Sequence, residues 1–232
     1  RAVLDSVLAI PGYQGILAFT LPEALWLSET HDDIVMGYPT TDRAALLALL
    51  ADDVAASRVT LMVDDVAQLD LIDALVAPHA RPVIRVAIDA DASWRAPAFG
   101  HIGVRRSPLH TPAEVAAFAA RIASRPGFQL VGLMMYEAQI AGQTDASGHQ
   151  DGLMRWMKRQ SGAELADRRG DIVAGVRRVA DLEFVNGGGT GSLEYTAADD
   201  AVTELTAGSG FLAGTLFDDY QGFQLAPAAA FA

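Results

Sequence analysis

A run of seven residues late in the chain has the composition of an anion-binding loop. The segment 186–192 (NGGGTGS) holds four glycines and follows an apolar run that predicts a strand. Glycine lets the backbone approach a ligand closely, and successive amide N–H groups in such a turn can point at one anion. The composition predicts a phosphate site, although a flexible glycine turn would look the same; the binding residues expected are Gly188, Gly189, Thr190 and Gly191.

A second glycine pair follows the next predicted strand, in the segment Gly208, Ser209 and Gly210. In (β/α)8 barrels a recurrent phosphate site is built from the loops after the seventh and eighth strands. The two glycine loops take those positions if one strand precedes Arg1. Their order and spacing therefore favour the phosphate interpretation over the flexible turn.

Nucleophiles and metal ligands are scarce. The chain has no cysteine, and its one lysine, Lys158, lies among arginines in a predicted helix, where a solvated structural role is expected. The adjacent acids Asp52-Asp53 and Asp64-Asp65 lie near predicted helix starts, where aspartate commonly caps the helix. We therefore expect no metal site within the chain.

Seven short apolar runs alternate with amphipathic stretches, a pattern typical of βα units and a parallel sheet. The runs are residues 15–20, 33–38, 58–63, 82–88, 129–136, 182–185 and 201–205. The predicted fold is α/β, a (β/α)8 TIM-type barrel whose first strand is missing from this chain. An open doubly wound sheet is the alternative, but no Gly-x-Gly-x-x-Gly follows an early strand.

The segments between these strands predict helices and two long loops. Residues 89–112 and 137–151 are expected to be irregular, and residues 152–180 helical, with Gly162, Gly170 and Gly175 arguing against one uninterrupted helix. The barrel is expected to occupy residues 1–225. The alanine-rich residues 226–232 are expected to begin an excised C-terminal β-domain.

The composition of the chain limits the classes of molecule that it is expected to bind. The chain has 232 residues and a formal net charge of −12, which argues against nucleic acid and anionic membranes because both bind basic surfaces. No apolar run reaches the roughly 18 residues that a membrane helix needs. A soluble, cytoplasmic protein that acts on small molecules is expected.

Several segments resemble the alanine racemase N-terminal barrel superfamily, and within it the D-threonine aldolase and D-serine dehydratase branch, most closely proteins described as amino-acid deaminase/aldolase. They are residues 37–43 (GYPTTDR), 101–108 (HIGVRRSP), 136–139 (YEAQ), 186–192 and 203–210 (TELTAGSG). The resemblance implies pyridoxal 5′-phosphate, held by its phosphate in the two glycine loops. It also implies a Schiff-base lysine, normally at the end of the first strand, upstream of Arg1, so that this fragment alone should be inactive.

The resemblance also implies roles for individual residues. Tyr136 would lie near the cofactor. His101 stands where relatives have an arginine, so that His101 or Arg105 would take over part of that arginine's role, unless His101 only closes a loop. Thr206 replaces the arginine beside the pyridine nitrogen in racemases, and Gln139 replaces a histidine of the aldolase branch.

The activity implied is a pyridoxal-phosphate-dependent lyase or deaminase of D-amino acids, with β-hydroxy substrates such as D-serine or D-threonine. The alternatives are an amino-acid racemase, a non-catalytic pyridoxal-phosphate-binding barrel, and an unrelated phosphate-binding barrel. The resemblance further implies a homodimer, and a divalent metal whose ligands lie in a second domain after Ala232.

Overall fold

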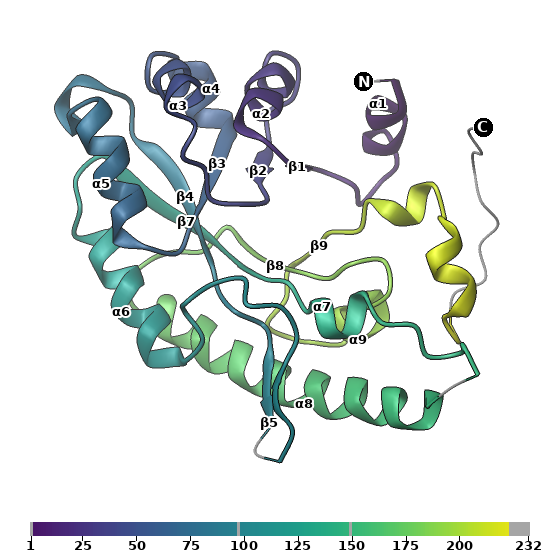
Figure 1. Cartoon of the computed structure of the whole chain (residues 1–232). Coiled ribbons are helices and arrows are strands. Elements are labelled where there is room, and N and C mark those ends of the chain that lie inside the picture. Colours follow the sequence, from purple (N-terminus) through teal and green to yellow (C-terminus); the bar gives the residue numbers. More distant parts are fainter. Residues whose placement is uncertain (1, 97, 149, 223–232) are drawn as a thin grey trace. The chain divides into compact units, whose positions relative to one another are not determined.

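The computed structural model describes residues 2–96, 98–148 and 150–222. Seven strands form one sheet in the order β1-β2-β3-β4-β7-β8-β9, and the strand pairs whose register is given are parallel (Figure 1). The strands of this sheet are β1 (Ile16–Ala18), β2 (Ile34–Met36), β3 (Val59–Val63), β4 (Ile84–Asp89), β7 (Phe128–Met135), β8 (Phe184–Gly187) and β9 (Glu204–Leu205). Neighbours in the sheet follow chain order without a reversal, which excludes the doubly wound alternative because that fold needs a switch point. The α/β class and all seven predicted strands are confirmed, whereas closure by an eighth strand stays a prediction.

The chain divides into two compact units. The first comprises Arg1–Asp89, Ala117–Val131 and Val179–Asp181, and the second comprises Ala90–Ala116, Gly132–Arg178 and Leu182–Ala232. The predicted barrel boundary at residue 225 and the expected start of a second domain at 226–232 lie outside the described residues.

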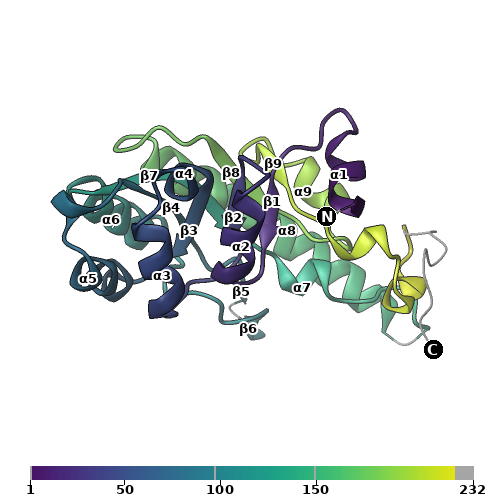
Figure 2. The ribbon, with the colours of Figure 1, turned by 90° about the horizontal axis from the view of Figure 1, so that it is seen from above.

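The first unit repeats one pattern, a short buried strand followed by capped helices. Figure 2 shows β1 to β4 side by side. The helices are α1 (Ala2–Leu8), α2 (Leu21–Ser28), α3 (Arg43–Leu50), α4 (Asp53–Arg58) and α5 (Val66–Leu75), with a 3-10 turn at Pro78–Ala80. Side chains of Asp42, Asp52 and Asp65 accept backbone N–H groups at the starts of α3, α4 and α5. The predicted capping role of Asp52 and Asp65 is thus confirmed, and no group of three potential metal ligands occurs among the described residues.

The second unit carries the less regular part of the chain. The end of β7 pairs with β8, and β8 pairs with β9, so the glycine loops begin at the carboxyl ends of neighbouring strands. Its other elements are the strands β5 (Trp94–Ala96) and β6 (Gly100–Ile102), the helices α7 (Ala138–Ala141), α8 (Asp151–Val176) and α9 (Leu193–Ala197), and 3-10 turns at Ser209–Phe211 and Thr215–Asp219. Helix α6 (Pro112–Ala123) and strand β7 contribute residues to both units.

Two expectations for this unit were wrong. The segment 89–112, expected to be irregular, contains the antiparallel hairpin β5–β6, which contacts α8 (Figures 1 and 2). Helix α8 runs without interruption through Gly162, Gly170 and Gly175. A Cβ at Gly162 would lie 3.2 Å from the Tyr195 ring, so close packing favours glycine at this position despite its weak helix propensity. No described helix is both long and apolar enough to cross a membrane.

Candidate functional site

The two glycine loops lie against each other, joined by the hydroxyl of Thr190. Thr190 Oγ1 lies 2.8 Å from Ser209 Oγ and accepts the Gly210 N–H at 2.9 Å. Each loop follows the carboxyl end of its strand, where the catalytic and binding residues of barrel enzymes lie. The structure therefore brings together the two segments that the sequence predicted would bind one phosphate.

Not every predicted donor in these loops is available to a ligand. The Gly189 N–H donates to Ser192 Oγ at 3.0 Å, and the Gly210 N–H is taken by Thr190. In the described part of the chain, the amide N–H groups of Thr190, Gly191 and Ser209 have no acceptor. The Gly188 and Gly208 N–H groups likewise have no acceptor among the described residues, so an anion could engage these five amides.

The glycines of the first loop also satisfy packing. A Cβ at Gly189 would lie 2.9 Å from Tyr136 Cε2, and one at Gly191 would lie 2.3 Å from the Ala141 carbonyl oxygen. Gly188 has a φ of +94°, which favours glycine. By contrast, a Cβ at Gly208 would meet no atom within 4 Å, so the space beside Gly208 is open.

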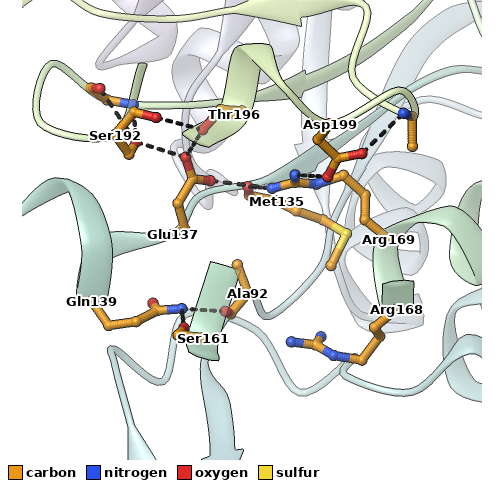
Figure 3. Close-up of polar contacts among 12 residues, drawn as sticks. Ala92, Met135, Glu137, Gln139, Ser161, Arg168, Arg169, Ser192, Thr196 and Asp199 are labelled. Atoms are coloured by element: carbon orange, nitrogen blue, oxygen red, sulfur yellow. Dashed lines mark hydrogen bonds and ion pairs between the residues drawn. The ribbon is translucent and has the colours of Figure 1, made fainter. Parts of the chain in front are cut away.

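A buried network of charged side chains supports the glycine loop (Figure 3). Glu137 Oε1 accepts the Ser192 hydroxyl at 2.7 Å and also the Thr196 hydroxyl. The Arg169 guanidinium lies between two carboxylates, 3.2 Å from Glu137 Oε2 and 2.5 Å from Asp199 Oδ2. Because Ser192 in turn accepts the Gly189 N–H, the network holds the loop in place through Ser192.

The neighbouring arginine on α8 holds a different segment. Arg168 donates to the backbone carbonyls of Asp91 at 2.8 Å, Ser93 at 2.9 Å and His110 at 3.2 Å, and forms an ion pair with Glu164 at 2.7 Å. These carbonyls lie in the loops on either side of the β5–β6 hairpin. Consecutive residues of α8 thus fix the glycine loop and the base of the hairpin.

Neither arginine was predicted to matter, because charged helix residues are usually solvated. A signal was nevertheless present in the spacing. Arg168 and Arg169 fall three or four residues from the buried Leu165 and Ile172, so both lie on the apolar face of α8.

Lys158 is also buried, at 1% exposure, so the expectation of a solvated lysine was wrong. Its Nζ lies 3.0 Å from Asp145 Oδ2 and 4.6 Å from the centre of the Tyr220 ring. Burial opposes the charged form of Asp145, but hydrogen bonds from the Gln221 N–H and Lys158 outweigh it and lower the Asp145 pKa. Burial, followed by the influence of Tyr136 and Asp145, raises the pKa of Tyr220 to about 12. These contacts tie the segment before residue 222 to α8 and give Lys158 a structural role.

The predicted catalytic residues lie in two places. His101 and Arg105 line one open cavity of about 660 Å³ beside the hairpin, together with Asp91, Arg95 and Arg106. Tyr136, directly after β7, packs against Gly189 at the other place. Arg106, not predicted as a site residue, connects them, because its guanidinium carbon lies 5.8 Å from the centre of the Tyr136 ring.

Thr206 and Gln139, which stand where relatives have an arginine and a histidine, both have well-defined hydrogen-bond partners. Thr206 Oγ1 accepts a hydrogen bond from Asn186 Nδ2 at 2.6 Å, and the same amide donates to Glu204 Oε1 at 2.7 Å. Gln139 is buried; its Nε2 donates to the Ala92 carbonyl at 2.7 Å and to Ser161 Oγ at 2.9 Å (Figure 3). Gln139 therefore positions the backbone at the base of the hairpin.

Comparison with known proteins gives one consistent result. No protein-family model matches the chain. A D-threonine aldolase from Arthrobacter sp. is 26% identical over 205 residues, covering 85% of this chain and 47% of the relative. The crystal structure of D-threonine aldolase from Filomicrobium marinum superimposes with a TM-score of 0.72 at 19% identity, covering 95% of this chain and 53% of that one.

Two further structures extend the comparison. Alanine racemase from E. faecalis has a TM-score of 0.61 at 17% identity, covering 94% of this chain and 50% of the racemase. At the level of the fold, the resemblance to the alanine racemase superfamily is confirmed. D-threo-3-hydroxyaspartate dehydratase from Delftia sp. HT23 shares this alanine racemase fold, with a TM-score of 0.59 at 20% identity. The match covers 85% of this chain and 48% of the dehydratase. The chain spans about half the length of each of these proteins.

Proposed function

We propose that this chain is the cofactor-binding part of a pyridoxal-phosphate-dependent lyase that acts on β-hydroxy D-amino acids. The observation that carries the proposal is the pair of glycine loops joined by Thr190, whose free amides and open space at Gly208 suit a phosphate. The resemblance to D-threonine aldolase and D-threo-3-hydroxyaspartate dehydratase supports the substrate class.

The residues present suit this cofactor. The amides of Thr190, Gly191 and Ser209 would hold its phosphate, and Tyr136, packed against Gly189, would lie beside its ring. Bound pyridoxal phosphate acts as an electron sink for charge that develops at the substrate Cα. A Schiff-base lysine from the first strand of the full-length barrel remains part of this proposal, because Lys158 is committed to Asp145.

Residues of this chain would direct the bond that breaks. Arg105 would bind the substrate carboxylate as a fork of N–H donors. His101 lines the same cavity as Arg105, so its imidazole would accept the proton of the substrate β-hydroxyl. Removal of that proton favours cleavage between Cα and Cβ, the aldolase outcome. Thr206 and Asn186 offer a neutral hydrogen-bonded pair where a racemase has an arginine, which favours lyase chemistry over racemisation.

The test is a matched pair of glycine variants in the full-length protein, titrated with pyridoxal phosphate and followed by visible absorbance. Gly208→Ala places a methyl group in the open space beside the loop and should weaken cofactor binding about tenfold or more, the equivalent of one hydrogen bond to a charged group. Gly214→Ala also enters open space, at a negative φ, and should bind like wild type. Wild-type affinity in Gly208→Ala, or no cofactor binding by the folded wild-type protein, would contradict the proposal.

We also propose, from the same resemblance, that the full-length enzyme is a cytoplasmic homodimer and that its second domain holds a divalent metal. Sedimentation of the full-length protein tests the first part, and loss of activity on chelation tests the second.

A further inference from the structure

A short segment near the end of the described chain, residues 215–221, packs against the first glycine loop. A Cβ at Gly191 would lie 2.9 Å from Tyr220 Cζ, so the buried Tyr220 ring is in close contact with the Gly191 backbone. The Tyr220 hydroxyl donates to the Ala141 carbonyl at 2.7 Å, and that carbonyl also lies against Gly191. The first loop is therefore supported by a residue that follows both glycine loops in the chain.

A second tyrosine packs on the same loop, two residues earlier. A Cβ at Gly189 would lie 2.9 Å from Tyr136 Cε2. The two tyrosines are near each other, because Tyr136 adds to the rise that burial causes in the Tyr220 pKa. The N–H groups of Thr190 and Gly191 have no acceptor among the described residues. Two aromatic rings thus restrict the backbone that carries these donors.

Polar contacts hold the segment 215–221 in place on both sides of its tyrosine. The Asp219 carbonyl accepts the Asp145 N–H at 3.1 Å, and the Gln221 N–H donates to Asp145 Oδ1 at 2.9 Å. Lys158 Nζ lies 3.0 Å from Asp145 Oδ2 and 4.6 Å from the centre of the Tyr220 ring. A cation over an aromatic ring is attracted to it, and more strongly when both are removed from water. Asp145 and Lys158 therefore fix the position of the ring.

The Tyr220 side chain has the surroundings of a support for the loop. Its hydroxyl proton is used in the bond to the Ala141 carbonyl. Its pKa of about 12, raised mainly by burial, keeps the hydroxyl neutral at pH 7, so Tyr220 places no negative charge beside an anion. The contribution of Tyr220 to anion binding would therefore come through the backbone that it holds.

We infer that Tyr220 is a positioning residue for the phosphate. By packing on Gly191, its ring holds the Thr190 and Gly191 amides in the orientation that an anion needs, and Lys158 and Asp145 act through it. This inference rests on the proposed function and adds a part to its phosphate site. The amides are held only while residues 215–221 are docked, so phosphate binding and docking of this segment are coupled. Such a coupling acts equally in both directions.

The first test measures ligand affinity in variants of the full-length protein. Inorganic phosphate is titrated by phosphorus NMR, and pyridoxal phosphate and pyridoxal, which differ only by the phosphate, by absorbance. Tyr220→Ala should weaken binding of both phosphate compounds about tenfold, the equivalent of one hydrogen bond to a charged group, and should leave pyridoxal affinity unchanged. Tyr220→Phe keeps the ring on Gly191 and should bind within about threefold of wild type. Leu216→Ala, an exposed residue of the same segment, is the control and should bind like wild type.

Three results of this test would overturn the inference, with circular dichroism used to verify that each variant is folded. The first is wild-type phosphate affinity in Tyr220→Ala. The second is an equal loss for pyridoxal phosphate and pyridoxal, which would show a merely structural role. The third is a loss in Tyr220→Phe as large as in Tyr220→Ala, because the ring would then contribute nothing.

The second test needs no variant and uses the coupling in the reverse direction. Saturation of the wild-type protein with inorganic phosphate should slow hydrogen exchange of the Gln221 N–H about fivefold or more. The Val54 N–H is the matched control, because it donates to Asp52 Oδ1 in the first unit at 2.9 Å, as Gln221 does to Asp145. Its exchange rate should stay unchanged. Unchanged exchange at Gln221, or equal slowing of both amides, would contradict the coupling.

The same titrations separate this inference from the proposed function. Pyridoxal phosphate binding that survives Tyr220→Ala at wild-type affinity would overturn this inference and leave the proposed function intact. Binding of inorganic phosphate that depends on Tyr220, in a protein that binds no pyridoxal phosphate, would support this inference and overturn the proposed function. Failure of the folded wild-type protein to bind either phosphate compound would overturn both.

Discussion

The two units bury different kinds of side chain. In the first unit the buried side chains are mainly Leu, Ile, Val, Met and Ala from short strands and capped helices, and the buried polar residues described there are Ser28, Thr60, Asp64 and Asp89. In the second unit many buried residues are charged or polar, including Glu137, Lys158, Arg168, Arg169 and Asp199. Packing supports the first unit, whereas hydrogen bonds and ion pairs position the loops of the second. The second unit, which buries more charged and polar side chains, also contains the candidate site.

Replacing Arg169 with methionine should have the largest effect, because it leaves Glu137 and Asp199 buried without their counter-charge. Loss of one partner from a buried ion pair costs about 3–5 kcal/mol of stability. Chemical denaturation should show this loss, and Arg159→Met, on the exposed side of α8, should change stability by less than about 0.5 kcal/mol. Similar values for the two variants would show that the network does not stabilise the second unit.

Replacing a buried leucine with alanine tests whether apolar packing stabilises the first unit. Leu49 in α3 is fully buried, and Leu49→Ala should cost about 2–5 kcal/mol by lost transfer energy and cavity formation. Leu47→Ala, on the same helix at 45% exposure, is the matched control and should cost much less. Cofactor affinity measured below the unfolding transition should stay at the wild-type value in both variants. A selective loss of affinity in Leu49→Ala would mean that the first unit also positions the glycine loops.

Thr190→Val removes the hydroxyl that joins the glycine loops and keeps the shape of the side chain. The Gly210 N–H then loses its acceptor, which costs about 1–3 kcal/mol when the group is buried. Thermal unfolding should record this loss, together with weaker binding of pyridoxal phosphate. Ser209→Ala leaves the bond from Gly210 to Thr190 intact and should have a smaller effect. An equal loss in both would assign the stabilisation to the contact between the hydroxyls alone.

The smallest effect concerns the start of α6 and depends on pH. Backbone N–H groups of Thr111 and His110 donate to Glu114, and these bonds lower the Glu114 pKa from 4.5 to about 2. Because the folded-state pKa is lowered, the stabilisation is fully present above about pH 4.5 and is lost as the pH falls toward 2. Glu114→Ala should cost about 1 kcal/mol at pH 7, and the difference from wild type should narrow below pH 4.5. Asp171→Ala, at an exposed position of α8, should show no such narrowing.

The two units also differ in how much of their structure could be predicted from the sequence. The strands were predictable because short apolar runs such as Val59–Val63 are bounded by turn residues and capped helices. The hairpin β5–β6 was missed because Trp94–Ala96 and Gly100–Ile102 are three residues each and neither belongs to a longer apolar run such as residues 15–20. The glycine loops were predictable because close approach of the backbone restricts residue type.

The buried network was not predictable by the same reasoning. Burial of Glu137, Arg169 and Asp199 depends on three segments, widely separated in the sequence, that place opposite charges together. A charged residue alone indicates solvent exposure, and only the combination of charge with the apolar face of α8 gives the opposite indication. The same holds for Lys158, whose partner Asp145 lies in a segment predicted to be a loop.

The adjacent positions of Arg168 and Arg169 restrict how this protein can vary over evolution. Successive residues leave a helix about 100° apart, so the direction of each side chain depends on the number of residues that precede it. Deleting one residue between Gly162 and Arg168 would rotate both guanidinium groups away from their acceptors at once, disturbing the hairpin base and the glycine loop in a single event. Insertions and deletions in this part of α8 should therefore be rare among related sequences, even where the helix surface is free to change.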